Sequence, residues 1–296
     1  MARNNGIASG ATAIITGAST GIGRALAIEL ARKHKAKMIL NARSADILEE
    51  TARDARQAGG EVITVVGDVA DMTIVDKLAK SALDNFGNLD ILVNNAGFAR
   101  PGRMDNINLD DWRAVFEVNV FAPVALTYAL LPHFLKARKG KIVNIASVAG
   151  KVAFPGSVCY ASSKFALTGF SEGMAAEYGG RGLDVITVCP GLVRTEFFKK
   201  NKNAQDFTAL AQEKNLTGWV VKNVISISSE DAAADILKAM ERGGSHEIVL
   251  TGPGKIIERI AGLCPPAAFY LSRFVPADRS PAAKTSAKPA SGESEN

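Results

Sequence analysis

The sequence predicts an α/β fold: one domain built on a doubly wound parallel sheet, with helices on both faces. Seven short apolar runs alternate with longer amphipathic stretches. The runs are TAIIT (12–16), KMILN (37–41), VITVVG (62–67), LDILVNN (89–95), KIVNIAS (141–147), LDVITVCP (183–190) and HEIVL (246–250). They are continuously rich in Val, Ile and Leu, which is typical of parallel strands covered on both faces. Because right-handed crossovers bring the carboxyl ends of such strands to one edge, we expect ligand-binding residues there.

Composition and charge are those of a globular protein with a large core. Of 296 residues, 47% are hydrophobic, and the net charge of +5 comes from 35 basic and 30 acidic residues. No long basic run with interleaved aromatic residues is present, so we expect no nucleic-acid partner. Cys159, Cys189 and Cys264 have no ligand spacing. We therefore expect no metal site and read all three as reduced core residues of a cytoplasmic protein. The N-terminal apolar run is too short for a secretory signal, and we expect no transmembrane span.

The first predicted strand runs directly into a glycine-rich turn and a helix, in the stretch TGASTGIGRALAIELARK. Glycines let the backbone approach a pyrophosphate closely, and the free N–H groups at the start of the helix favour an anion. A tight turn without a ligand is the alternative. Its position after the first strand favours a dinucleotide site. The residues expected to contact the dinucleotide are Gly17, Ser19, Thr20, Gly21, Ile22 and Gly23.

The turn after the second strand indicates which dinucleotide binds. An acidic residue there would bind the ribose hydroxyls of NAD, but the chain instead has Arg43 and Ser44. The guanidinium of Arg43 suits a 2′-phosphate, which favours NADP. Alternatively, Arg43 is a solvated charge and Ser44 only caps a helix. After the third strand, Asp68, followed by Val69, is placed to bind the adenine amino group, although Asp68 could equally be an N-cap.

The stretch VCYASSKFAL places Tyr160 and Lys164 four residues apart, on one face of a predicted helix. An unperturbed tyrosine has a pKa of about 10, and an adjacent ammonium favours the phenolate. Lowering this pKa by about three units takes roughly 4 kcal/mol, so a dry pocket and a cationic nicotinamide would have to help. The preceding strand ends at Ser147, which can donate a hydrogen bond to a carbonyl oxygen.

Together these motifs resemble the short-chain dehydrogenase/reductase family, in its NADP-preferring branch. The resemblance covers roughly residues 8–252 and implies a Rossmann-like fold. The motifs that carry it, in order, are Thr16–Gly23, NNAG at Asn94–Gly97, Asn119, Ser147, YASSK at Tyr160–Lys164, and Pro190 and Gly191 followed by Thr195. One departure is Thr20, because some NADP-preferring members have a basic residue there. Arg43 would then carry most of the selectivity.

The resemblance also implies roles for individual residues. Tyr160 is the acid/base, Lys164 holds the nicotinamide ribose and lowers the tyrosine pKa, Ser147 orients the substrate oxygen, and Asn119 supports a proton relay. The segment containing Asn95, Ala96 and Gly97 stabilises the sheet and borders the cofactor. The loop with Pro190, Gly191, Val193 and Thr195 meets the nicotinamide or the phosphates.

These residues predict hydride transfer between NADP(H) and a carbonyl or secondary alcohol, with reduction favoured. An apolar ketone, steroid-like or fatty-acyl, is expected from the apolar residues Phe197, Phe198, Phe207, Leu210 and Trp219, although these could equally be core. One alternative is reduction of a 3-oxoacyl group on acyl carrier protein or coenzyme A, with Lys199, Lys200 and Lys202 facing the acidic carrier. The alternative from another class is a non-catalytic protein that senses NADP(H).

Beyond the sheet, the chain is expected to end in a helical extension and a tail. We expect a flexible N-terminus at 1–7, the NADP-binding catalytic domain at 8–252, amphipathic helices at 253–275 and a disordered tail at 276–296. The extension has an apolar stripe that is interrupted by Pro265 and Pro266. We expect it to form a lid or to contact a second subunit, because the resemblance extends to hydroxysteroid-type branches whose C-terminal extensions sit near the pocket mouth. Contact with a membrane surface and ordinary core packing are the alternatives. The resemblance also implies a homodimer or homotetramer, because the family's long helices commonly pack together, and the helix around TGFSEGMAAEYG is rich in small residues.

Overall fold

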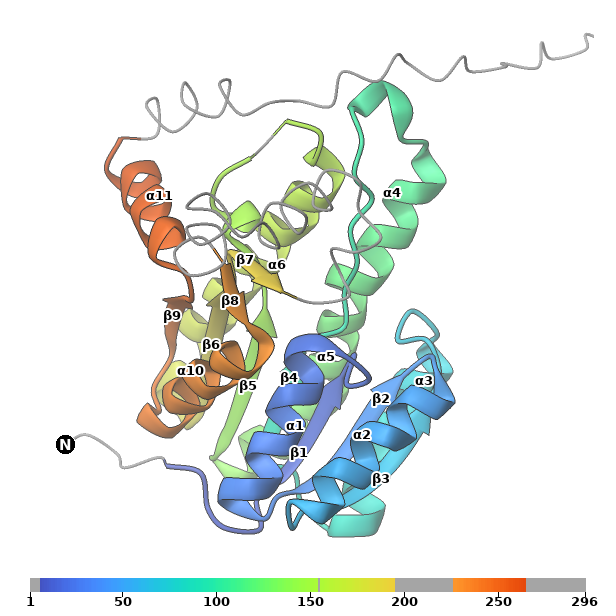
Figure 1. Cartoon of the computed structure of the whole chain (residues 1–296). Helices are drawn as coiled ribbons and strands as arrows, with labels where there is room; N and C mark the ends of the chain where they lie inside the picture. The colour runs from blue at the N-terminus through green and yellow to red at the C-terminus, as the bar shows by residue number, and fades with distance from the viewer. Residues whose placement is uncertain (1–5, 154, 195–225, 265–296) are drawn as a thin grey trace, which may run out of the picture.

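A computed structural model describes residues 6–153, 155–194 and 226–264 and contains a seven-stranded parallel sheet (Figure 1). The strand order is β3-β2-β1-β4-β5-β6-β9. The strands are β1 (Thr12–Thr16), β2 (Lys37–Ala42), β3 (Glu61–Val66), β4 (Ile91–Asn94), β5 (Gly140–Ile145), β6 (Leu183–Cys189) and β9 (His246–Val249). All seven predicted strands are confirmed. The order reverses between β1 and β4, which is where open α/β sheets bind ligands.

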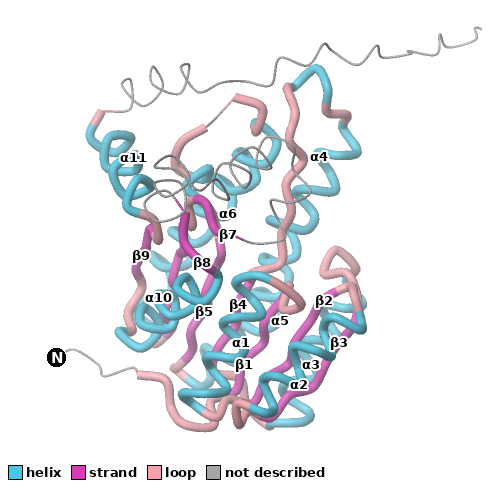
Figure 2. Tube along the Cα trace, viewed as in Figure 1, coloured by secondary structure: helices cyan, strands magenta, loops and turns pink. Residues whose placement is uncertain are grey.

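Helices cover both faces of the sheet, as the unbroken apolar strands predict (Figure 2). On one face lie α1 (Gly21–His34), α2 (Ala45–Gln57) and α10 (Ser229–Arg242), and on the other α3 (Met72–Phe86), α5 (Ala122–Ala137) and α6 (Val158–Tyr178). The neighbouring residues Ile14 and Ile15 of β1 point to opposite faces, and both are fully buried. The two cores therefore hold the carboxyl edge of the sheet rigid.

Shorter elements complete the fold around that edge. They are α4 (Leu109–Phe116), a π-helical turn (Glu117–Phe121), α11 (Gly252–Leu263) and the 3₁₀ turns Met104–Asn106, Val148–Gly150 and Gly179–Arg181. A second, two-stranded parallel sheet pairs β7 (Leu192–Arg194) with β8 (Ser226–Ser228). The sequence did not predict this small sheet.

Within the described residues, one continuous helical stretch, Leu109–Ala137, is long and apolar enough to span a membrane, with a mean hydropathy of 1.7. Much of it is inside the protein, because 44% of its most apolar window is buried. The part formed by α5 packs against α3 and β5 and buries Leu126, Leu130 and Phe134. This is the burial of a helix that covers one face of the sheet.

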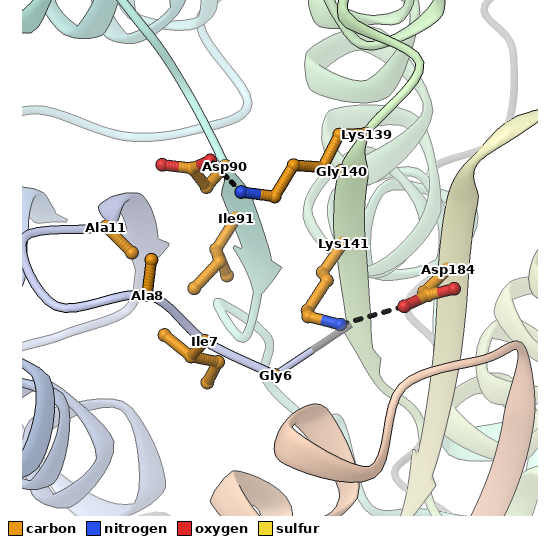
Figure 3. Close-up of a pocket in the computed structure, with 10 residues that line it drawn as sticks. All are labelled: Gly6, Ile7, Ala8, Ala11, Asp90, Ile91, Lys139, Gly140, Lys141 and Asp184. Atoms are coloured by element: carbon orange, nitrogen blue, oxygen red, sulfur yellow. Dashed lines mark hydrogen bonds and ion pairs between the residues drawn. The ribbon is translucent and has the colours of Figure 1, made fainter. Parts of the chain in front are cut away.

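A small cavity of about 20 Å³ lies at the amino edge of the sheet (Figure 3). It is bounded by Gly6–Ala8, Asp90 and Lys139–Lys141. Beside it, Lys141 Nζ lies 2.8 Å from Asp184 Oδ2, in a buried ion pair that joins β5 to β6. A cavity of this size holds about one water molecule, so it is no dinucleotide site.

The structure corrects one expectation about the cysteines and confirms the first helix of the extension. Cys159 and Cys189 are buried, but Cys264 is exposed directly after α11, so the prediction that all three are core residues is wrong for Cys264. The first helix expected in the extension is confirmed as α11, on which Ile256 and Leu263 are exposed. The second expected helix and the tail at 276–296 lie outside the described residues.

Candidate active site

The turn after β1 is shaped by close contact with the segment after β4. Gly17 has a φ of 64°, and a Cβ there would lie 2.8 Å from the Cα of Ala96. A Cβ on Gly23 would lie 2.5 Å from the carbonyl oxygen of Gly17. Only glycine fits both positions, so the spacing read from the sequence has a steric cause.

Asn95 and Thr16 fasten these two segments together. Asn95 Nδ2 donates to the carbonyl oxygens of Thr16, at 2.9 Å, and Gly17, at 3.0 Å. Thr16 Oγ1 accepts from the backbone N–H groups of Asn95, at 3.1 Å, and Ala96, at 3.0 Å. The amide of Asn95, expected at the cofactor, thus holds the glycine turn in the protein itself.

The first turn of α1 is open to an anion. Its N-cap is Thr20, which is exposed and makes no side-chain capping hydrogen bond, and the turn contains no acidic residue. Ser19 and Ile22 are half-buried beside it. The uncapped N–H groups and the helix dipole suit a pyrophosphate, so the expected phosphate site fits its residues.

The turns after β2 and β3 bring Arg43 and Asp68 together. Arg43 Nη1 lies 3.7 Å from Asp68 Oδ2, and the two side chains are 72% and 42% exposed. Ser44 occupies the N-cap position of α2 without a side-chain capping hydrogen bond. Asp68 accepts from the N–H of Ala70 at 3.0 Å.

Asp68 is not a helix cap, so that alternative is wrong. The N-cap of α3 is Asp71, whose carboxylate accepts from the N–H of Thr73 at 2.9 Å. Val69, between them, is buried. Arg43 and Asp68 follow the carboxyl ends of β2 and β3, at the sheet edge where the adenosine half of a dinucleotide would lie.

Ser147, Tyr160 and Lys164 converge at the carboxyl edge of β5. Helix α6 places Lys164 Nζ 5.8 Å from the centroid of the Tyr160 ring. Ser147 begins the 3₁₀ turn Val148–Gly150, where its Oγ accepts from the N–H of Ala149 at 3.1 Å, and its side chain hydrogen-bonds to Tyr160. Lys164 Nζ donates to the carbonyl oxygen of Ile145 at 2.8 Å.

Burial governs the protonation of this group in the protein alone. It raises the pKa of Tyr160 to about 12, even though the hydrogen bond with Ser147 acts to lower it. Burial also lowers the pKa of Lys164 to about 8. The phenol is therefore protonated at neutral pH, and the expected lowering of the Tyr160 pKa by Lys164 does not prevail in the protein without a cofactor.

Asn119 lies in the π-helical turn and is fully buried. Its Oδ1 accepts from the N–H of Phe98 at 3.0 Å, and its Nδ2 donates to the carbonyl oxygen of Phe98 at 2.9 Å and to Ser163 Oγ at 3.0 Å. Ser163 Oγ donates in turn to the carbonyl oxygen of Tyr160 at 2.7 Å. Such turns often mark functional sites, and here the turn links α6 to the segment after β4.

Gly97 fills the space between Asn119 and Lys164. A Cβ on Gly97 would lie 3.1 Å from Asn119 Oδ1 and 3.4 Å from Lys164 Nζ. Sequence reasoning missed the roles of Phe98 and Ser163, although Ser163 stands inside the YASSK motif.

The described part of the segment after β6 packs against the Ser147 turn and against Thr251. The carbonyl oxygen of Pro190 accepts from the N–H of Val148 at 2.9 Å, which ties this segment to the Ser147 turn. Gly191 packs against Thr251, and Val193 is buried in β7. The predicted residues outside the described part of the chain are Thr195, Phe197, Phe198, Phe207, Leu210, Trp219, Lys199, Lys200 and Lys202.

Proteins of known activity are similar to this chain in sequence. A 3-oxoacyl-[acyl-carrier-protein] reductase of Synechocystis sp. is 37% identical over 193 residues, which cover 65% of this chain and 78% of that protein. An NADP-dependent 3-hydroxy acid dehydrogenase of Schizosaccharomyces pombe is 34% identical over 235 residues, 79% of this chain and 88% of that protein.

A solved structure and a family model extend the likeness. The crystal structure of a short chain dehydrogenase from Mycobacterium paratuberculosis bound to NAD matches with a TM-score of 0.69 and 26% identity, over 83% of this chain and 98% of that one. A family model described as short chain dehydrogenase matches residues 11–206. The chain therefore belongs to the short-chain dehydrogenase/reductase family of oxidoreductases, which use a nicotinamide cofactor.

Proposed function

We propose that this protein transfers hydride between NADP(H) and a carbonyl or secondary alcohol. The observation that carries the proposal is the convergence of Ser147, Tyr160 and Lys164 at one strand end, with the Ser147 side chain hydrogen-bonded to Tyr160. A proton donor, an oxygen-orienting hydroxyl and a cation are the groups that carbonyl reduction requires. A non-catalytic sensor of NADP(H) would not need all three.

Arg43 supports NADP over NAD as the cofactor. The guanidinium carries a fork of donors that matches a phosphate, and its ion pair with Asp68 is exposed and 3.7 Å long. Such surface pairs contribute at most about 1 kcal/mol, so a 2′-phosphate can compete for Arg43. The relative from Schizosaccharomyces pombe is named as NADP-dependent, whereas the solved relative is bound to NAD.

In the reducing direction, Tyr160 acts as the acid. When the reduced cofactor is bound, its nicotinamide would supply the hydride to the carbonyl carbon and become oxidised. Ser147 donates a hydrogen bond to the carbonyl oxygen, and the Tyr160 hydroxyl gives its proton to that oxygen as negative charge develops. Because burial raises the pKa of Tyr160 to about 12, this proton is in place at neutral pH.

After the transfer, Tyr160 must regain a proton. The ammonium of Lys164 spends one of its three N–H bonds on the carbonyl oxygen of Ile145 and can use the others for the ribose and for stabilising the phenolate. Asn119 lies across Gly97 from Lys164 and is fixed in place by its hydrogen bond from the N–H of Phe98. We propose that protons return along this side of the site.

For the substrate, the relatives favour a 3-oxoacyl group or a related 3-hydroxy acid. Their names state 3-oxoacyl-[acyl-carrier-protein] reductase and 3-hydroxy acid dehydrogenase activities. These names support the 3-oxoacyl alternative that the sequence also offered. We propose an acyl-chain ketone as the substrate class, in a cytoplasmic enzyme.

We also propose self-association through the outer face formed by the π-helical turn, α5 and α6. Phe121, Tyr128 and Phe165 are 54%, 80% and 44% exposed there. On α6, Gly169 and Gly173 follow Phe165 at intervals of four residues, and a Cβ on either would meet no atom within 4 Å. Exposed aromatic side chains beside small residues suit a helix-to-helix contact.

For the 253–275 extension we propose a role as a lid or a subunit contact, with membrane contact as the alternative.

We expect Tyr160→Phe to lower kcat by about 10²- to 10⁴-fold, the usual contribution of a general acid. NADPH binding, measured by fluorescence titration, should change little, because only the hydroxyl is removed. The assay is NADPH oxidation, followed by absorbance, with a panel of 3-oxoacyl esters and apolar ketones. Turnover equal to that of the parent protein would refute the assignment of Tyr160 as the acid.

We expect Arg43→Asp to reduce the ratio of kcat/KM for NADPH to kcat/KM for NADH by about 10- to 100-fold, since a charged hydrogen bond contributes roughly 1.5 to 3 kcal/mol. Arg113→Asp is a matched control, because Arg113 is also 72% exposed and lies on α4. If the two variants kept the same cofactor preference as the parent, Arg43 would not select NADP.

We expect Lys164→Met to stabilise the cofactor-free protein while abolishing turnover. Burial lowers the pKa of Lys164 from 10.5 to about 8, so the charged form costs up to about 3 kcal/mol. That cost is fully present below pH 8 and disappears as the pH rises to 10.5, the pKa of Lys164 in the unfolded chain. The gain in Tm should therefore be largest at pH 7 and shrink towards pH 10. A lower Tm at pH 7 would contradict the buried-cation assignment.

We expect light scattering at micromolar concentration to give at least twice the chain mass of 31.2 kDa. Phe165→Glu, which places a charge on the outer face of α6, should lower the measured mass towards one chain. A monomeric parent protein, or an oligomer insensitive to this change, would exclude the proposed contact.

A further inference from the structure

The turn that carries Ser147 is fastened by a lysine that sequence reasoning did not single out. Lys151 follows the 3₁₀ turn Val148–Gly150. Its Nζ lies 2.7 Å from Glu247 Oε2 on β9 and 3.2 Å from Glu172 Oε1 on α6. The side chains of Lys151 and Glu247 are only 21% and 25% exposed, whereas that of Glu172 is 64% exposed. The pair with Glu247 is therefore the shielded and shorter one.

The two carboxylates belong to different layers of the fold, Glu247 to strand β9 of the sheet and Glu172 to helix α6. Strand β9 pairs with β6, and α6 packs against β6 while carrying Tyr160 and Lys164 (Figure 1). Lys151 thus connects the Ser147 turn to the sheet and to the catalytic helix at once.

The turn also packs directly on the backbone of α6. A Cβ on Gly150 would lie 2.7 Å from the carbonyl oxygen of Lys164 and 2.9 Å from Thr168 Oγ1. On its other side, the N–H of Val148 donates to the carbonyl oxygen of Pro190 at 2.9 Å. The turn therefore has little room to move while Lys151 keeps it against the helix.

The charge on Lys151 is secure at neutral pH. Burial alone would lower its pKa, but the hydrogen bond with Glu247, aided by Glu172, outweighs burial and raises the pKa. Cys189 also interacts electrostatically with Lys151. Burial is the main reason that the pKa of the Cys189 thiol is raised to about 12, so the thiol stays neutral. Lys151 is therefore the charged partner in both ion pairs at neutral pH.

We propose that Lys151 is a positioning residue: through Glu247 and Glu172 it holds the Ser147 turn against α6, and so keeps Ser147 within hydrogen-bonding distance of Tyr160. The inference rests on the proposed function for its effect on turnover. It does not depend on that function for its effect on the Ser147 to Tyr160 hydrogen bond. Small displacements of an orienting group are costly in catalysis, even when folding is unaffected.

The test compares Lys151→Met, Lys151→Arg, Glu247→Gln and Glu172→Gln, with Lys238→Met as control. Lys238 forms a pair of 3.2 Å with Asp235 on α10, away from the Ser147 turn. We expect Lys151→Met to lower kcat by about tenfold or more with KM for NADPH within about twofold. Lys151→Arg should restore most of the rate, and Glu247→Gln should cost more than Glu172→Gln.

A readout that needs no turnover separates this inference from the proposed function. In protein labelled with ¹³Cζ-tyrosine, the Tyr160 signal at pH 8 reports its hydrogen bond with Ser147. Lys151→Met should move that signal towards its position in Ser147→Ala, with the far-ultraviolet circular dichroism unchanged. An unmoved Tyr160 signal in Lys151→Met overturns the inference. Absence of turnover in the parent protein, with the signal moved in the variant, refutes only the proposed function.

Discussion

The burial of Lys164 is the constraint around which the site is organised. Its Nζ is bound to the carbonyl oxygen of Ile145, and no carboxylate of the described chain pairs with it. An unpaired buried cation is costly, and here the cost appears as a pKa lowered to about 8. A side chain at Gly97 would crowd Asn119 and contact Lys164 Nζ, and one at Gly150 would clash with the carbonyl oxygen of Lys164. A ligand that brings hydroxyl oxygens to this ammonium would relieve the cost, which couples cofactor binding to the stability of the folded protein.

The segment after β4 connects the two halves of the site. Asn95 fixes the glycine turn where a pyrophosphate would bind, and two residues later Gly97 borders Lys164 and Asn119. One short piece of chain thus sets the spacing between the phosphate end and the reacting end of the site. The sheet makes this possible because β1 and β4 are direct neighbours, so the turns that follow them meet at the same edge.

Most of the fold could be predicted from the sequence. A strand that is buried on both faces needs consecutive apolar residues, and the turn after β1 needs glycines, so both leave a pattern in neighbouring residues. The helical spacing of Tyr160 and Lys164 is equally local. What could not be predicted depends on contacts between distant segments. The β7–β8 sheet joins strands of three residues each, too short for a periodic signal. Asn119, in the π-helical turn, is hydrogen-bonded to Phe98, which lies 21 residues earlier in the chain. The ion pair of Lys151 with Glu247 forms only because β9 lies beside β6. The raised pKa of Tyr160 is a balance of burial against a hydrogen bond, and composition does not reveal burial.

The central claim is that the protein alone keeps Tyr160 protonated and that the cofactor completes the site. It is tested most directly by titrating ¹³Cζ-tyrosine-labelled protein with and without NADP⁺, with Tyr160 assigned among the four tyrosines by its absence in Tyr160→Phe. Burial raises the pKa of Tyr160 to about 12 in the free protein. The account predicts no titration of Tyr160 below about pH 10, the ordinary tyrosine value, in the free protein, and a markedly lower pKa once the cationic nicotinamide is bound. A phenolate already present near neutral pH without cofactor, or a pKa unmoved by NADP⁺, would contradict it.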